Sequence, residues 1–212
     1  MIKSIIQLVY DNTIREYLPR QVKVYNGVSL NIGRLFDTTI IAPHYKQGTI
    51  DPLRKYTNCE DRVVVIGGGT GVSAVVAARQ THSVTVYEGG SEYADQVRAT
   101  ARLNRVEARI DVREAIVGEN IDVYGESLAD SVVPPSNIAS CDVLEMDCEG
   151  AEEEILRNME IDPRVIIVES HPGFGVDPQT IRSLLTDRDY KIVSQFELNQ
   201  GNITFTGIRE DN

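Results

Sequence analysis

The sequence predicts an α/β domain built on a mostly parallel β-sheet with helices on both faces. Three observations favour this fold class. Apolar runs of strand length alternate with helical patterns from Arg62 onward. The first run, Val63–Ile66, is continuously apolar, as expected for a strand that is buried on both faces. A glycine-rich turn follows this run and leads into a helical pattern, which is the arrangement of a βαβ unit.

Two residues near the N-terminus predict a β-hairpin. Asn26-Gly27 lies between the apolar-patterned runs Val22–Tyr25 and Val28–Asn31. Asn-Gly is a strong signal for a two-residue hairpin turn, because both turn residues need a positive φ. The exposed edge of such a hairpin offers unpaired backbone groups. A homodimer that pairs through this edge is therefore one expectation.

The first sixty residues differ in pattern from the rest of the chain. An apolar stretch within Met1–Tyr10 predicts an amphipathic helix, and a second, short helix is expected around Asp51–Tyr56. We therefore expect residues 1–60 to form an N-terminal extension, a lid or cap made of these helices and the hairpin. Residues 61–212 are expected to form the main domain.

The main domain is predicted to contain seven strands and four helices. Strands are expected at Val63–Ile66, Ser83–Tyr87, Arg109–Arg113, Cys141–Met146, Arg164–Val168, Tyr190–Glu197 and Asn202–Arg209. Helices are expected at Val72–Gln80, Ser91–Asn104 with Ser91 as the N-cap, Ala151–Met159, and from the pair Asp177-Pro178 to Asp187. The last two strands are joined by a short turn, so they must be antiparallel neighbours. One reversed strand is thus expected near the C-terminal end.

The composition limits the partners of the protein. A net charge of −11 over 212 residues disfavours a nucleic-acid partner on electrostatic grounds. Only five of the 21 cationic residues are Lys, and acidic residues are many. This composition is typical of proteins from salt-loving microbes, but an ordinary acidic protein is the alternative. No apolar run approaches the roughly 20 residues that cross a bilayer. The opening stretch lacks a small-residue cleavage signature. We therefore expect a cytoplasmic protein that does not bind membranes.

The glycine turn predicts a nucleotide-like ligand. It consists of Gly67, Gly68, Gly69, Thr70 and Gly71, between a buried strand and a helix. Glycines let a ligand approach the backbone closely, and the helix N-terminus offers free N–H groups. Glu88 ends the next strand, where a carboxylate can accept hydrogen bonds from both ribose hydroxyls. The turn fits G-x-G-x-x-A, used for NAD or FAD, and also G-x-G-x-G, used for S-adenosylmethionine (SAM). The motif alone leaves both open.

The stretch DVLEMDCEGAEEEIL, residues 142–156, carries a family resemblance. Asp147 follows a buried strand, at the sheet edge where ligands bind, whereas Glu152–Glu154 fit a helix start that the macrodipole stabilises. The run from Asp147 to Glu152 resembles the D-x-E-G-A-E element of the FkbM-like family of SAM-dependent methyltransferases. Glu169-Ser170-His171-Pro172 is similar to the Glu…His-Pro that such proteins tend to show after the next strand. The resemblance covers roughly residues 50–209 and implies the Rossmann-like class I methyltransferase fold.

Two positions depart from the family pattern. Val65 stands where the family often has an acidic residue, two positions before the first glycine. Glu145 stands where it often has Lys, two positions before Asp147. Both departures are compatible with SAM binding, but the second leaves the charge of the active site open.

The resemblance implies roles for several residues. The turn glycines Gly67, Gly69 and Gly71 would contact the methionine and ribose portions of SAM. Glu88 would hold the ribose, and Glu114 and Ala115 would lie beside the adenine. Asp147 would face the methionine amino group or the methyl acceptor.

A hydroxyl acceptor requires a general base within hydrogen-bond reach. The candidates are Asp147, Glu169 and His171, all predicted at the carboxyl edge of the sheet. We therefore expect O-methylation of a small-molecule or sugar-like hydroxyl. No metal site is expected, because the three Cys lack metal-ligand spacing and the three His lie far apart. The alternatives are an NAD(P)-dependent oxidoreductase and a non-catalytic ligand-binding protein with a degenerate methyltransferase fold.

Overall fold

The computed structural model describes residues 10–38, 40–118, 131–198 and 201–209. The chain divides into two compact units, Met1–Tyr45 and Lys46–Asn212. The division precedes the boundary placed at residue 60 from the sequence, because helix α2, Gln47–Tyr56, packs against elements of the second unit. The helix expected within Met1–Tyr10 falls on residues 1–9, which lie outside the described part.

The first unit contains the predicted hairpin. Asn26 and Gly27 have φ values of 49° and 78°, so both turn residues adopt the positive φ that the Asn-Gly signal requires. The three strands have the order β2-β1-β3, so β2 and β3 are the edges of this small sheet. The elements are β1 Arg20–Tyr25, β2 Val28–Arg34, β3 Ile41–Ala42, and the helical turns η1 Tyr10–Ile14 and η2 Arg15–Tyr17. Pairing of an edge with a second subunit stays a prediction.

Asp37 organises the polar interior of the first unit. Its carboxylate accepts hydrogen bonds from the Tyr10 hydroxyl at 2.9 Å and from Arg15 at 3.0 Å. Lys23 lies 2.8 Å from the same carboxylate, and the Arg34 backbone N–H donates to it. Burial alone would raise the pKa of this carboxyl, but these donors outweigh burial and hold the pKa well below its usual range.

The second unit is built on a seven-stranded sheet with the order β11-β12-β10-β9-β4-β5-β6. β12 runs antiparallel to both of its neighbours, and the pairs from β10 to β6 are parallel. This confirms the predicted mostly parallel sheet with one reversed strand. The strands are β4 Arg62–Ile66, β5 Ser83–Glu88, β6 Ile110–Glu114, β9 Val143–Met146, β10 Val165–Ser170, β11 Lys191–Glu197 and β12 Ile203–Ile208.

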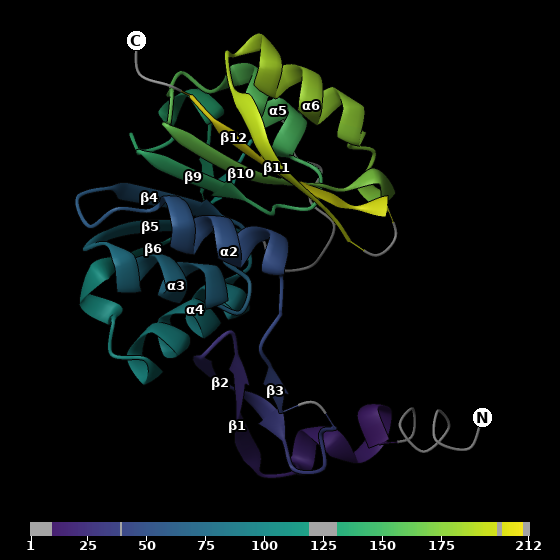
Figure 1. Ribbon diagram of the computed structural model, residues 1–212. Coiled ribbons are helices and arrows are strands. Elements are labelled where there is room, and N and C mark those ends of the chain that lie inside the picture. Colours follow the sequence, from purple (N-terminus) through teal and green to yellow (C-terminus); the bar gives the residue numbers. More distant parts are fainter. Residues whose placement is uncertain (1–9, 39, 119–130, 199–200, 210–212) are drawn as a thin grey trace. The chain divides into compact units, whose positions relative to one another are not determined.

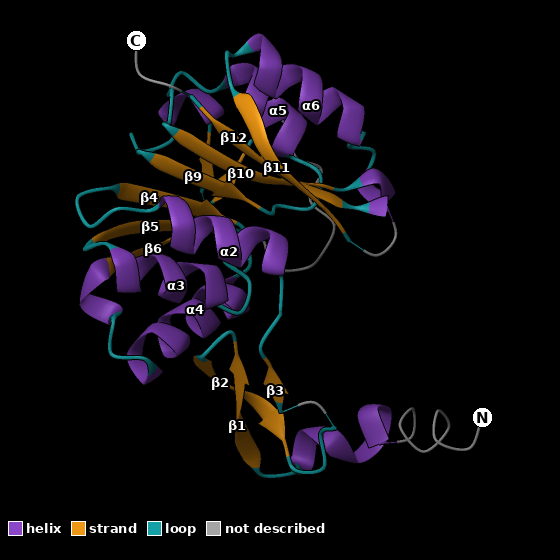
Figure 2. Ribbon diagram, in the orientation of Figure 1, coloured by secondary structure: helices purple, strands orange, loops and turns teal. Residues whose placement is uncertain are grey.

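Helices cover both faces of this sheet, as predicted, with α2, α3 and α4 on one face and α5 and α6 on the other (Figure 1, Figure 2). The helices after α2 are α3 Val72–Gln80, α4 Ser91–Leu103, α5 Glu152–Asn158 and α6 Pro178–Asp187. Short elements complete the unit: η3 Glu107–Arg109, η4 Pro135–Asn137, η5 Pro172–Phe174, and the paired strands β7 Ile116–Val117 and β8 Val132–Val133.

Ser91 is not the N-cap that the sequence predicts. It is the first residue of α4, and Gly90 occupies the N-cap position without a side-chain cap. The carboxylate of Glu88 accepts the Gly90 N–H at 2.9 Å, which fixes the chain at this point. Likewise, Asp177 occupies the N-cap position of α6 but makes no side-chain cap hydrogen bond.

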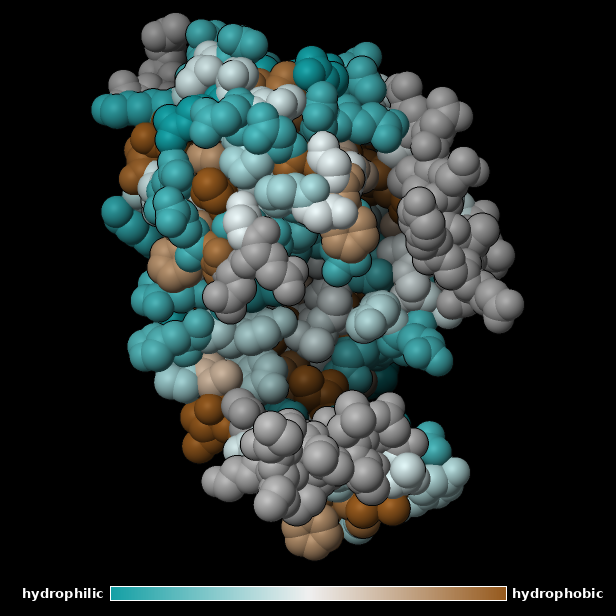
Figure 3. All heavy atoms as spheres, turned by 90° about the vertical axis from the view of Figure 1, so that its right-hand side faces the viewer, coloured by the Kyte–Doolittle hydropathy of each residue, from teal (hydrophilic) through white to brown (hydrophobic). Residues whose placement is uncertain are grey.

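One face of the second unit is mainly hydrophilic. On the face in Figure 3, polar residues prevail over this unit and apolar residues are scattered among them. Single exposed apolar side chains are normal on a protein surface. Within the described ranges, no helix is both long enough and apolar enough to span a membrane.

Candidate functional site

Gly67 brings the glycine turn into direct contact with the end of β9. Its N–H donates to the Tyr87 carbonyl at 2.9 Å and its φ is 88°. A Cβ at this position would lie 2.8 Å from the carbonyl carbon of Asp147 and would overlap the carbonyl oxygen. Only glycine permits this approach. The turn and Asp147 therefore form one continuous site.

Gly69 faces open space. Its φ is 50°, and a Cβ added there would meet no heavy atom within 4 Å. Its N–H donates to Glu88 Oε2 at 2.9 Å, while Glu88 Oε1 accepts the Gly90 N–H. The structure thus places Glu88 beside the glycine turn, as the sequence predicts, and the turn exposes backbone to a ligand.

The remaining turn residues are fixed by the neighbouring elements. A Cβ at Gly68 would lie 2.6 Å from a methyl group of Val86 in β5. The Thr70 carbonyl accepts a hydrogen bond at 2.8 Å from the buried hydroxyl of Thr100 in α4. Gly71 has a φ of 84° and occupies the N-cap position of α3. No sequence pattern indicated the role of Thr100, because it lies thirty positions after Thr70.

The two residues predicted beside an adenine are oriented differently. Ala115 is buried, and its N–H donates to the Glu88 carbonyl at 3.0 Å. The Glu114 side chain is exposed and lies 3.8 Å from the guanidinium of Arg98 in α4. Both residues thus join the predicted site through their backbone, since Glu114 pairs with Glu88 in the sheet, but the Glu114 side chain points to Arg98.

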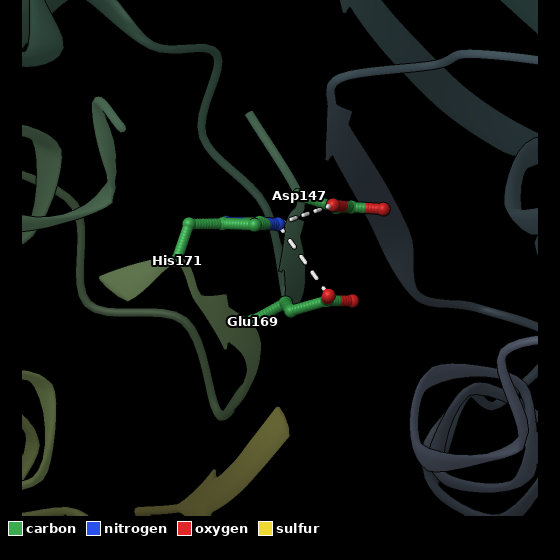
Figure 4. Close-up of side chains that lie close together, drawn as sticks. All are labelled: Asp147, Glu169 and His171. Atoms are coloured by element: carbon green, nitrogen blue, oxygen red, sulfur yellow. Dashed lines mark ion pairs between the residues drawn. The ribbon is translucent and has the colours of Figure 1, made fainter. Parts of the chain in front are cut away.

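The three predicted general-base candidates meet at the carboxyl ends of β9 and β10. His171 Nε2 lies 3.3 Å from Asp147 Oδ1 and 3.4 Å from Glu169 Oε1. Figure 4 shows the imidazole pointing at both carboxylates, which extend side by side. His171 and Glu169 are each 6% exposed. Asn202, at the start of β12, donates its amide to Glu169 Oε1 at 3.0 Å.

Glu152 holds His171 from the opposite side. Its fully buried carboxylate lies 2.7 Å from His171 Nδ1 and accepts the N–H groups of Cys148 and Gly150 at 3.2 and 2.9 Å. Its half-buried neighbours Glu153 and Glu154 fit the interpretation as helix-start charges, whereas the contacts of Glu152 give it a further role. A sequence signal for this further role was available, because Glu152 is the last residue of the D-x-E-G-A-E element.

Lys46 supplies a positive charge that the sequence did not predict. It precedes α2, and its ammonium group forms an ion pair and hydrogen bond with Asp147 Oδ2. Its charge also acts on Glu145 and Glu169. Lys46 therefore compensates in space for the Lys that is replaced by Glu145 in the strand. The two partners lie 101 positions apart, so no local pattern links them.

These contacts shift the ionisation of the cluster. Complete burial raises the pKa of Glu145 to about 8, even though Lys46 opposes the shift. Burial disfavours the charged form of His171, but hydrogen bonds to Glu152 and Glu169 outweigh it and raise the pKa to about 9. Burial likewise opposes ionisation of Glu169, yet its bonds to His171 and Asn202 hold its pKa below the ordinary value.

The sequence matches one known protein family. The model of the methyltransferase FkbM domain family matches residues 26–192. No curated protein matches the chain in sequence. This family match favours SAM over the dinucleotides that the glycine motif had left open.

Solved structures show the same fold at low sequence identity. One is ribosomal protein L11 methylase from Lactobacillus delbrueckii subsp. bulgaricus, with a TM-score of 0.56, 15% identity, and coverage of 84% of this chain and 88% of that chain. Another is the precorrin-6y C5,15-methyltransferase of Geobacter metallireducens, with a TM-score of 0.53, 13% identity, and coverage of 85% of this chain and 94% of that chain. A third is a SAM-dependent O-methyltransferase of Thermotoga maritima, with a TM-score of 0.54, 13% identity, and coverage of 84% of this chain and 69% of that chain. The fold is that of the class I methyltransferases. Because the family match spans most of its length, the chain belongs to the FkbM methyltransferase family and is a SAM-dependent methyltransferase.

Proposed function

We propose that this enzyme methylates a hydroxyl group of a small molecule, at the sheet edge formed by the ends of β4, β5, β9 and β10. One observation carries the proposal. Gly67 touches the backbone of Asp147, whose side chain belongs to the cluster with His171 and Glu169. The turn that suits a cofactor and the groups that suit proton removal are therefore adjacent.

The glycine turn and Glu88 fit SAM. Gly69 leaves room for close approach, because nothing lies within 4 Å of an added Cβ. Each carboxylate oxygen of Glu88 accepts one backbone N–H and keeps a second lone pair, which can accept a ribose hydroxyl. Ala115 would line the adenine side, together with the backbone beside Glu114. When bound, SAM supplies a methyl group that is already activated on a sulfonium.

The polar cluster is suited to an acceptor hydroxyl. Such a group is a weak nucleophile until its proton is removed. Glu152 fixes the ring of His171, so that Nε2 faces Asp147 and Glu169. We assign deprotonation of the acceptor to this cluster. Lys46 holds the second oxygen of Asp147 and keeps that carboxylate oriented.

Calorimetric titration with SAM tests the cofactor site. Wild-type protein should bind SAM in the micromolar range. Replacement of Glu88 by Ala removes charge-assisted hydrogen bonds worth about 1.5–3 kcal/mol and should weaken binding about 10- to 100-fold. The matched control is Glu92→Ala, since Glu92 is an exposed acidic residue in the first turn of α4. Absence of SAM binding by folded wild-type protein would refute the cofactor site.

Turnover tests the acceptor class. Formation of S-adenosylhomocysteine should be stimulated by polyhydroxylated small molecules and not by amines of similar size. Asp147→Asn and Glu169→Gln should each lower kcat at least tenfold, with SAM affinity retained in Glu169→Gln. Stimulation by amines alone, or full turnover in both variants, would contradict hydroxyl methylation by this cluster.

A further inference from the structure

Three metal-ligand atoms converge at the ends of β9 and β10. His171 Nε2, Asp147 Oδ1 and one carboxylate oxygen of Glu169 all lie within 4.8 Å of one another. Figure 4 shows the imidazole directed at the two carboxylates, which extend side by side. No metal site was expected from the sequence, because the cysteines lack metal-ligand spacing and the histidines lie far apart along the chain. The sheet, however, brings one histidine and two carboxylates from adjacent strand ends to one point.

The distances suit metal ligands better than hydrogen-bond partners. The separations of 3.3 and 3.4 Å from His171 Nε2 to the two carboxylate oxygens exceed the usual N–H···O length of about 2.9–3.0 Å. Ions such as Zn²⁺ and Mg²⁺ bind nitrogen and oxygen at about 2.0–2.2 Å, so adjacent donors lie about 2.9–3.5 Å apart. The two separations from His171 Nε2 fall within this range.

Glu152 provides the second layer that such sites need. Histidines that bind metals almost always donate their other ring N–H to a carboxylate or carbonyl, which fixes the tautomer. The carboxylate of Glu152 lies 2.7 Å from His171 Nδ1 and is itself held by two backbone N–H groups. Nε2 faces Asp147 and Glu169, so an ion that displaces its proton would bind the Nε2 electron pair between these two carboxylates.

Glu169 supplies an independent observation that favours a cation at this point. Its Oε1 accepts the Asn202 amide, but its Oε2 is buried and has no hydrogen-bond partner among the described residues. Burying such an oxygen without a donor or cation is costly. In this cluster, Lys46 contributes one permanent positive charge beside the carboxylates of Asp147, Glu152 and Glu169.

We propose that Asp147, Glu169 and His171 bind one divalent transition-metal ion of the Mn²⁺ type. Carboxylates suit Mg²⁺ and Mn²⁺, whereas imidazole suits transition metals such as Zn²⁺. A site with two carboxylates and one imidazole combines both preferences and therefore favours Mn²⁺. Lys46 occupies Asp147 Oδ2 and leaves Oδ1 for the ion. The open coordination positions suit an acceptor hydroxyl, whose pKa the ion lowers. This last role rests on the proposed methylation of hydroxyls, whereas ion binding does not.

Titration of Mn²⁺ into chelator-treated full-length protein tests the site. Calorimetry and the loss of the free Mn²⁺ signal in electron paramagnetic resonance should both give one ion per chain. Asp147→Asn, Glu169→Gln and His171→Gln should each weaken binding at least tenfold. Glu160→Gln is the matched control, because Glu160 is an exposed glutamate outside the cluster, and it should bind like wild type.

A second measurement covers variants that fold poorly. Saturating Mn²⁺ should raise the Tm of wild-type protein and of Glu160→Gln, but not that of the three site variants. No saturable binding by folded wild-type protein, or equal binding by all three site variants, would overturn the proposal. Neither titration contains SAM or an acceptor. A failed metal test therefore leaves the methyl-transfer proposal standing, and failed methyl transfer leaves the metal site standing.

Discussion

Replacing Gly67 with alanine tests how closely the glycine turn packs against β9. The φ of 88° costs an L-residue about 1–2 kcal/mol. The new Cβ would also lie 2.8 Å from the carbonyl carbon of Asp147, a backbone atom that cannot swing away. Overpacking of this kind costs about 1–3 kcal/mol. The free energy of unfolding should therefore fall by about 2–5 kcal/mol, which is a large share of a typical domain stability of about 5–15 kcal/mol.

Gly69→Ala is the matched comparison. It shares the positive φ, at 50°, but an added Cβ meets nothing within 4 Å. It should cost about 1 kcal/mol in stability yet weaken SAM binding at least tenfold, because the methyl group enters the space left for the ligand. Urea unfolding followed by circular dichroism suits a chain without Trp. With m of about 2 kcal/mol per M, Gly67→Ala should lower the midpoint by about 1–2.5 M. Equal destabilisation by both substitutions would refute the packing argument.

Three further outcomes are expected. Glu152→Ala removes a buried carboxylate that accepts three hydrogen bonds and should cost about 3–5 kcal/mol in urea unfolding; a loss below 1 kcal/mol would contradict its positioning role. Thr100→Val deletes the bond to the Thr70 carbonyl and should cost about 1–2 kcal/mol by the same assay, and an unchanged midpoint would count against it. Because the folded pKa of Asp37 lies below its ordinary value of 3.8, its stabilisation is complete at neutral pH and is lost as the pH falls below about 4. The free energy of opening of the β1–β2 amides, measured by hydrogen exchange, should therefore change less with pH in Asp37→Asn than in wild type. An unchanged pH dependence would argue against this linkage.

Local patterns predicted the elements whose causes are local. The Asn26-Gly27 turn, the buried strand before Gly67 and the helix Val72–Gln80 all lie where sequence periodicity and turn chemistry place them. The two-residue strands β7 and β8 were not predicted, because they are too short to produce a periodic signal.

The site could be predicted only in part. Asp147, Glu169 and His171 were named as candidates because each was predicted just after a strand, and parallel strands end at the same edge. Lys46 joins Asp147 across 101 positions, which no spacing rule describes. Glu152 was assigned to the helix dipole, because that local effect gives a sufficient reason for an acidic residue at a helix start. A local explanation that suffices can thus hide a tertiary role.

The place of β12 in the sheet has a consequence for biosynthesis. β12 lies between β10 and β11 but follows both in the chain, and β11 pairs with β12 alone in the described sheet. While the ribosome is still translating the preceding residues, β10 and β11 therefore cannot complete the sheet, and Glu169 lacks the amide of Asn202. The reactive edge is assembled only after Asn202 and the residues of β12 have left the exit tunnel. Nascent chains that stall before this point therefore lack both the strand that joins β10 to β11 and the amide that holds Glu169.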